Sequence, residues 1–238
     1  MATAILVDGE FFLRRFEHSF PKLDRSDARQ VVYGLRVLVH WHLILKFDPS
    51  TVQERLKKNY NAEETDDLYR IFFYDCEPLQ KRMHTPLGKV SMDFGKTPSA
   101  MFRIALHSEI QKLRKVALRL GRLNETTRWK LSIEATERLI QNPDSFVATD
   151  DDFKIDTVQK GVDMRLGLDV ASLAFKKQVN QIVIVSADAD FVPAAKLARR
   201  EGIDVVLDRM GAQNAAIDLI QHVDGVRDCL NPDAQMPE

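Results

Sequence analysis

Short runs of apolar residues, each followed by a stretch with helical periodicity, constrain the fold of this chain more than any other feature. Runs rich in Ile, Val, Leu and aromatic residues occupy positions 4–7, 70–74, 181–185 and 203–207. The apolar residues in each run are consecutive rather than alternating, which is typical of strands covered on both faces in a parallel sheet. Strands that alternate with helices predict an α/β fold with a doubly wound, mainly parallel sheet flanked by helices.

Four segments between these runs have the spacing of amphipathic helices. Three of them carry an apolar stripe, and the fourth ends at Gly202, a common residue just after a helix. The expected helices cover residues 26–46 (stripe at 31, 35, 38, 42 and 45), 99–118 (102, 106, 110, 113 and 117), 162–177 (162, 166, 170 and 173) and 189–201. His40 and His42 are about 200° apart on the first helix, so they do not share a face as zinc ligands would and are interpreted as packing and surface residues.

The segment 76–155 departs from this alternation. It begins with a stretch rich in Pro and Gly, continues with the basic helix 99–118, and includes a region at 119–133 whose pattern suits a hairpin. Asp150, Asp151 and Asp152 form a charge run that is typical of a solvated loop. We therefore expect residues 1–238 to form a single domain, with residues 76–155 as an inserted helical and hairpin segment or lid. The chain length suits this organisation.

The cysteines and the hydropathy pattern indicate a cellular compartment. Cys76 and Cys229 are the only two cysteines and lack close spacing, which argues against a disulfide framework or a thiolate zinc site and favours a reducing environment. The first residues read as a strand rather than a signal peptide. The most apolar window, 31–47, contains several polar residues and suits a buried helix better than a membrane span. The sequence predicts a cytoplasmic protein that does not bind membranes.

Aspartates gather where the predicted strands end. Asp8 follows the first run, Asp188 and Asp190 follow 181–185, and Asp163 opens the helix at 162. Ligands of open α/β sheets bind beyond the carboxyl ends of the strands, the same edge at which Asp75 and Asp208 end their strands. Crowded carboxylates repel one another, so a cation is expected among them, and oxygen ligands suit Mg²⁺ or Mn²⁺. The structural alternative is that an acid such as Asp190 only caps its helix.

Three motifs in this order resemble the NYN domain family, and more narrowly its LabA-like branch: Asp8-Gly9, then 160–163 (Lys-Gly-Val-Asp), then 186–191 (Ser-Ala-Asp-Ala-Asp-Phe). NYN domains belong to the PIN-like nuclease superfamily, so the resemblance implies a PIN-like fold and a metal-dependent ribonuclease. It also implies that Asp8, Asp163, Asp188 and Asp190 are the catalytic and metal-binding residues. Many relatives have Asn where this chain has Phe11. Asp169, about 240° around the helix from Asp163, is expected to be structural.

A basic segment suggests where a nucleic acid would bind. Residues 101–130 contain eight Lys or Arg and two acids, whereas the rest of the chain has 26 basic and 33 acidic residues. A local positive field beside a metal site suits a phosphate backbone, so Lys160, Arg114, Lys115, Arg119 and Arg122 are candidate substrate-binding residues, and Trp129 a candidate for stacking on a base. The alternatives are that the charges are the solvated face of a helix and that Trp129 is a core residue.

Three functions are compatible with these features. The leading hypothesis is a Mg²⁺- or Mn²⁺-dependent endoribonuclease that hydrolyses the phosphodiester bonds of RNA, expected to be single-stranded. The alternative, suggested by Phe11, is a non-catalytic RNA- or protein-binding module with the same fold. A phosphatase that uses Asp8 ranks below both, because Asp8-Gly9-Glu10 lacks a second Asp. No GxxxxGK[ST] or GxGxxG loop is present, which argues against nucleotide hydrolysis and Rossmann dehydrogenases. Homo-oligomer formation is left open.

Overall fold

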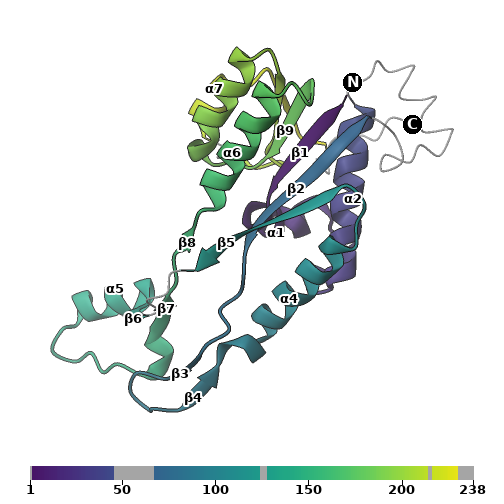
Figure 1. Cartoon of the computed structure of the whole chain (residues 1–238). Coiled ribbons are helices and arrows are strands. Elements are labelled where there is room, and N and C mark those ends of the chain that lie inside the picture. The colour runs from purple at the N-terminus through teal and green to yellow at the C-terminus, as the bar shows by residue number, and fades with distance from the viewer. Residues whose placement is uncertain (1, 46–66, 124–127, 214–215, 230–238) are drawn as a thin grey trace.

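The part of the chain that the structure describes is built around one sheet of seven strands (Figure 1). The computed structural model describes residues 2–45, 67–123, 128–213 and 216–229. Within them the strand order is β11-β10-β9-β1-β2-β5-β8, and every neighbouring pair is parallel except β5 and β8. The strands are β1 (Thr3–Asp8), β2 (Leu68–Cys76), β5 (Val116–Leu123), β8 (Gln159–Lys160), β9 (Gln181–Val185), β10 (Asp204–Asp208) and β11 (Gly225–Arg227).

The mainly parallel, doubly wound sheet predicted from the apolar runs is confirmed. β1 lies between β2 and β9, with Ile5 beside Ile71 on one side and Val183 on the other. All three side chains are buried. A strand with neighbours on both edges and helices on both faces can be apolar at every position, which is why the runs do not alternate.

Helices cover both faces of the sheet and bury the side chains that alternate along each strand. The two faces form separate clusters: one contains Ile5, Val7 and the aromatic residues of α1, the other Ala4, Leu6 and Val170. Full burial of a Leu or Phe side chain contributes about 1.5–3 kcal/mol. On the first face lie α1 (Gly9–Ser19), α2 (Ala28–Ile44) and α4 (Pro98–Gln111); on the second lie α6 (Val162–Phe175), η4 (Ala189–Phe191), α7 (Val192–Arg200) and α8 (Ile217–Gln221).

The stripe predicted for residues 26–46 is buried at all but its last position. Val31, Leu35, Leu38 and His42 are at most 1% exposed, whereas Leu45 is 38% exposed and ends the helix. Residue 46 lies outside the described residues. The stripe of α6 is likewise buried at 166, 170 and 173.

Two predictions for the region after α4 are wrong. The helix expected over 99–118 ends at Gln111, and Lys115 has a φ of 58°, which breaks the helical backbone before β5 begins. Leu113 and Ala117 fitted the helical spacing only by coincidence. The hairpin expected over 119–133 is also absent: β5 pairs with β2 and β8, while β6 (Arg128–Leu131) pairs with β7 (Phe153–Asp156). Residues 124–127 lie outside the described part of the chain.

An arm, defined as residues 77–97 and 128–158, projects beyond the carboxyl ends of β1, β2 and β5 (Figure 1). It contains the pair β6–β7 and a second antiparallel pair, β3 (Arg82–His84) with β4 (Ser91–Asp93). The Trp129 indole N–H donates to the His84 carbonyl at 3.0 Å and joins the two pairs. The remaining elements are η2 (Phe94–Lys96), α5 (Ile133–Gln141) and η3 (Asp150–Asp152). The projecting part is thus smaller than the segment 76–155, because α4 and β5 belong to the central layers.

The charge run at 150–152 is not the solvated loop that the sequence suggested. It forms the short helix η3, in which Asp152 is 6% exposed and pairs with Arg138. Asp150 accepts the backbone N–H groups of Leu87 and Gly88 at 2.8 and 2.9 Å. Two of the three carboxylates therefore hold the arm together. Among the described residues, none of the helices has the length and apolar character that crossing a membrane requires.

Candidate functional site

Asp8 stands at the carboxyl end of β1 and begins α1. One carboxylate oxygen accepts the backbone N–H of Phe11 at 3.1 Å, and the other accepts the Ser186 hydroxyl at 3.1 Å. The following Gly9 has no room for a side chain, because a Cβ there would lie 2.6 Å from the Tyr74 carbonyl oxygen. Glycine therefore lets α1 start directly against β2, and this holds Asp8 at the sheet edge.

The turn after β9 brings two further carboxylates to the same edge. Ser186 bridges Asp8 to this turn, since its hydroxyl oxygen also accepts the Asp188 N–H at 3.2 Å. Asp188 caps η4 by accepting the Asp190 N–H at 3.0 Å, so the capping role considered for Asp190 belongs to Asp188. Both side chains are exposed.

Asp163 comes from the first turn of α6. The residue before this helix, Gly161, has a φ of +81°, a left-handed conformation that glycine adopts without strain. This turn carries the chain from β8 into α6 and presents the exposed Asp163 carboxylate.

The charges of these acids act on one another. Burial raises the pKa of Asp8, and the negative charges of Glu10 and Asp163 raise it further against the two hydrogen bonds that lower it. The pKa of Asp163 is also raised, first by burial and then by the charges of Asp188 and Asp190. Because nearby like charges disfavour ionisation, these interactions link all four predicted acids into one electrostatic cluster.

The spacing of these carboxylates suits a divalent cation that keeps several of its waters better than a cation enclosed entirely by protein ligands. In the described residues no three of them have ligand atoms within 4.8 Å of one another. Mg²⁺ commonly keeps several waters and binds one or two carboxylates directly, so a more open set of acids suits it. The oxygen chemistry and the unrelieved repulsion both fit such an ion.

Glu10 and Phe11 differ in how they face this edge. The exposed Glu10 carboxylate accepts the Gln159 side-chain N–H at 3.1 Å, which ties α1 to β8. Phe11 is 2% exposed and belongs to the core beside α1. Where many relatives have an amide, this chain therefore has a ring in the interior.

Lys160 and Arg122 lie close to the acid cluster. They face each other across the antiparallel pair β5–β8, and both are exposed. Like charges directly opposite on paired strands are destabilising, and a bound anion would relieve that repulsion. Lys160 is three residues before Asp163, so this pair borders the acids.

The other three candidate substrate-binding residues have different surroundings. The Arg119 guanidinium makes two hydrogen bonds to Asp169, at 2.9 and 3.1 Å, and lies 5.4 Å from the centroid of Phe72. The structural role predicted for Asp169 agrees with this pair. Lys115 donates to the Leu68 carbonyl at 2.8 Å, at the start of β2. Arg114 and Lys115 therefore lie at the amino edge, opposite the acids.

Two further aspartates at strand ends are bonded to partners that sequence reasoning missed. Asp75 pairs with Arg103 and with His107 at 2.7 Å; burial raises its pKa, but these partners outweigh burial, so the net pKa is lowered. Asp208 pairs with His42 at 2.8 Å and accepts the Met210 N–H at 2.7 Å. The sequence feature that could have indicated the Asp75 partners is the spacing of Arg103 and His107, which lie one helical turn apart on α4.

Cys229 joins the second pair. Its sulfur lies 3.3 Å from His42 Nδ1, and His42, Asp208 and Cys229 are the only described group whose ligand atoms all lie within 4.8 Å. Burial and the Asp208 charge raise the pKa of the Cys229 thiol, so the protonated thiol is favoured. The three groups can satisfy one another through hydrogen bonds, which explains the buried histidine without a metal.

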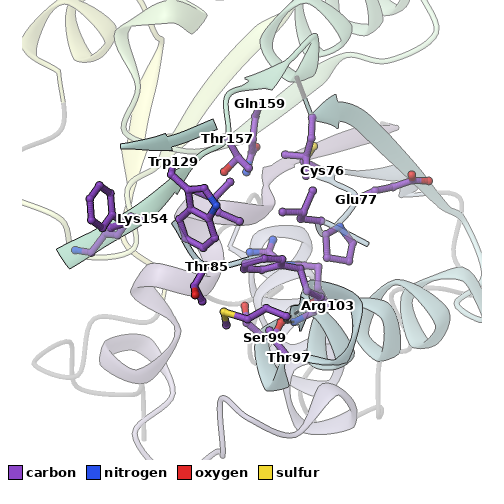
Figure 2. A pocket seen from close by; sticks show the side chains of 18 of the residues that line it. Cys76, Glu77, Thr85, Thr97, Ser99, Arg103, Trp129, Lys154, Thr157 and Gln159 are labelled. Carbon is purple, nitrogen blue, oxygen red and sulfur yellow. Dashed lines mark hydrogen bonds between the residues drawn. The ribbon is translucent and has the colours of Figure 1, made fainter. Parts of the chain in front are cut away.

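A pocket of about 610 Å³ opens between the arm and the sheet edge (Figure 2). Gln159, whose side chain bonds Glu10, lines it together with the indole of Trp129. Sequence reasoning did not find this pocket, because β2, α4, β5 and both parts of the arm contribute to it.

Comparison with known proteins gives one family match and one structural match. A solved structure of a protein of unknown function from Vibrio parahaemolyticus aligns over 96% of this chain and 94% of its own, with 14% identity and a TM-score of 0.43. No curated protein matches the chain. The family model of the NYN domain matches residues 146–230, which include Asp163, Asp188 and Asp190 but not Asp8. Over these residues the chain is similar to the NYN domain family, the family that its sequence motifs resemble.

Proposed function

We propose that the protein is an endoribonuclease that uses Mg²⁺ or Mn²⁺ to hydrolyse phosphodiester bonds in single-stranded RNA. The observation that carries the proposal is the electrostatic cluster at the sheet edge, in which burial and then the charges of neighbouring carboxylates raise the pKa values of Asp8 and Asp163. NYN domains suggest RNA as the substrate and typically act with divalent metals. The LabA-like branch and a cytoplasmic location remain predictions from the sequence.

Each residue has a task that follows from its position. Asp8, Asp163, Asp188 and Asp190 would hold the cation, while Ser186 fixes the orientation of Asp8 by donating to it. When bound, such an ion polarises a phosphoryl oxygen and makes water more acidic. Lys160 and Arg122 would bind phosphates of the strand beside the scissile bond. Arg119, Arg114 and Lys115 are not assigned to this site because of their positions.

The test is cleavage of labelled single-stranded RNA by the full chain with Mn²⁺ or Mg²⁺, and after removal of metal with EDTA. We expect Asp188→Asn to reduce cleavage roughly 100-fold or more, since changing groups outside the ligand shell of a metal already costs 10–100-fold. Asp144→Asn, an exposed acid of the arm, is the matched control and should cleave like the unmodified protein. Equal rates for the protein and its Asp188→Asn variant would reject the proposal.

The burial of Phe11 favours one competing function, an RNA- or protein-binding module without catalysis, because the amide ligand of relatives is missing. Calorimetric titration of the metal-free protein with MnCl₂ separates the two. A nuclease binds Mn²⁺, and Asp163→Asn weakens that binding. A module without catalysis would cleave no RNA, and failure of the unmodified protein to bind Mn²⁺ would identify it.

A further inference from the structure

The pocket between the arm and the sheet has walls suited to a flat, uncharged ligand. Its lining includes the aromatic rings of Phe94, Trp129 and Phe153 together with aliphatic side chains. Hydroxyl and amide groups, such as those of Thr157 and Gln159, lie at its border (Figure 2). Apolar walls with a few polar groups are the usual composition of small-ligand sites.

The charges around the pocket disfavour a phosphate inside it. Two basic residues line it, and both have acidic partners: Arg103 is bound by Asp75, and Lys154 pairs with Glu134 at 3.3 Å. Three acids, Glu77, Asp150 and Asp151, also line the pocket. A phosphate would meet net negative charge there, whereas a neutral ring carries no charge for these acids to repel and can pack against the aromatic and aliphatic walls.

The indole of Trp129 is held ready for stacking. Its N–H donates to the His84 carbonyl at 3.0 Å, which fixes the ring across the two strand pairs of the arm. The Phe94 ring lies 6.0 Å from it at an angle of 58°. Both rings line the pocket, so a third ring that entered it would meet an aromatic wall. Bases of single-stranded nucleic acids stack on aromatic side chains in this way.

Gln159 links the pocket to the neighbourhood of the acid cluster. Gln159 lines the pocket and bonds Glu10, which is two residues after Asp8. From Gln159 the chain passes through the exposed Lys160 to Asp163, a span of at most about 14 Å between Cα atoms. A strand that places a base in the pocket would therefore pass Lys160 and Arg122 on its way to the acids.

We propose that this pocket binds an unpaired base of the RNA strand, stacked on Trp129, close to the bond that is cut. The inference rests on the proposed ribonuclease function for the identity of the ligand. It assigns the arm a role in holding the substrate, separate from the acids that perform the chemistry.

Binding without cleavage tests the inference. Trp41→Phe leaves Trp129 as the only tryptophan of the chain, so the fluorescence reports directly on its surroundings. In EDTA we expect a short single-stranded oligoadenylate to quench this fluorescence. An oligomer with the same phosphates and abasic riboses should not quench it.

We also expect Phe94→Ala to weaken oligoadenylate affinity about tenfold, measured by anisotropy of a labelled strand, as loss of one stacking ring does. Phe146→Ala, a ring of the arm outside the pocket, is the matched control.

The outcomes separate the pocket from the nuclease. Equal quenching by the abasic strand, or unchanged affinity in Phe94→Ala, overturns the pocket inference even if the protein cleaves RNA. Tighter binding of free adenosine monophosphate than of the strand also overturns it, since the pocket would then be a site for free nucleotides. Base-dependent quenching in the Asp188→Asn variant supports it, whether or not the unmodified protein cleaves.

Discussion

Two groups of aspartates at the same edge of one sheet have opposite electrostatic environments. Asp75 and Asp208 are at most 2% exposed and are paired with histidine or arginine side chains. The Asp163, Asp188 and Asp190 residues are exposed overall, and partial burial and then the charges of Asp188 and Asp190 raise the pKa of Asp163. The position at a strand end is therefore not what distinguishes a structural acid from a candidate metal ligand.

The helices on the first face account for the difference. α4 presents Arg103 and His107 to Asp75, and α2 presents His42 to Asp208. Asp8 and Asp188 of the candidate site instead accept hydrogen bonds from uncharged donors, such as the Ser186 hydroxyl to Asp8 and the Asp190 N–H to Asp188. A neutral donor orients a carboxylate and leaves its charge available to a cation.

The largest effect that this comparison predicts is on stability. Asp75→Asn leaves Arg103, 23% exposed, without its counter-charge and His107, 10% exposed, without its carboxylate partner. Breaking a buried ion pair on one side costs about 3–5 kcal/mol, so we expect a loss of about 3 kcal/mol in the free energy of unfolding, measured by urea denaturation. Asp188→Asn relieves repulsion and should change stability by less than about 0.5 kcal/mol, as surface substitutions usually do. Similar losses in both variants would remove the distinction.

Much of the fold could be predicted from the sequence because its strands are buried on both faces. β1, β2, β9 and β10 are continuous apolar runs that only a covered strand explains. β5 was missed because its residues are mostly half-buried, so that Val116 and Ala117 fitted the end of the helix expected over 99–118 and the residues from 119 fitted a hairpin. The local pattern does not record that β5 has β2 on one side and only the short β8 on the other.

The candidate site was predictable only as a set of acids. Motif order identified Asp8, Asp163, Asp188 and Asp190, but their sequence neighbours do not reveal the charges that reach them. Asp75 on β2 accepts a hydrogen bond from Arg103 on α4, which lies 28 residues later in the sequence. Trp129 was proposed for stacking, and whether it faces a pocket depends on the joining of two strand pairs by its bond to His84.

The second prediction concerns metal and pH. Mn²⁺ that binds only the folded protein should stabilise it by about 2.7 kcal/mol at a concentration 100 times its Kd. This corresponds to a rise in Tm of several degrees for a chain of this size. Asp163→Asn should remove most of that rise, whereas Asp144→Asn should keep it. A rise that Asp163→Asn leaves intact would place the metal elsewhere.

The pH dependence has opposite signs in the two groups. Because the pKa values of Asp8 and Asp163 are raised in the folded state, their protonated forms favour folding, and this contribution is lost as the pH rises through those values. The pKa of Asp75 is lowered in the folded state, so its ionised form stabilises the fold at pH values above the ordinary pKa of an Asp. That contribution is lost as the pH falls through the lowered pKa. We therefore expect the Mn²⁺-induced rise in Tm to shrink as the pH falls and protons compete with the ion. A rise in Tm that is constant from pH 8 to pH 4 would contradict this.

The smallest effect comes from Asp169, which is intermediate between the two groups. It accepts hydrogen bonds from Arg119 and from the Tyr74 hydroxyl at 2.9 Å, but its side chain is 20% exposed and that of Arg119 is 39% exposed. Solvent weakens such a pair, so Asp169→Asn should cost about 1 kcal/mol in urea denaturation. It should leave Mn²⁺ affinity unchanged, because Asp169 belongs to the paired acids despite its place on α6, six residues after Asp163. Loss of Mn²⁺ binding in this variant would move Asp169 into the metal site and show that pairing with a cation does not separate the two groups.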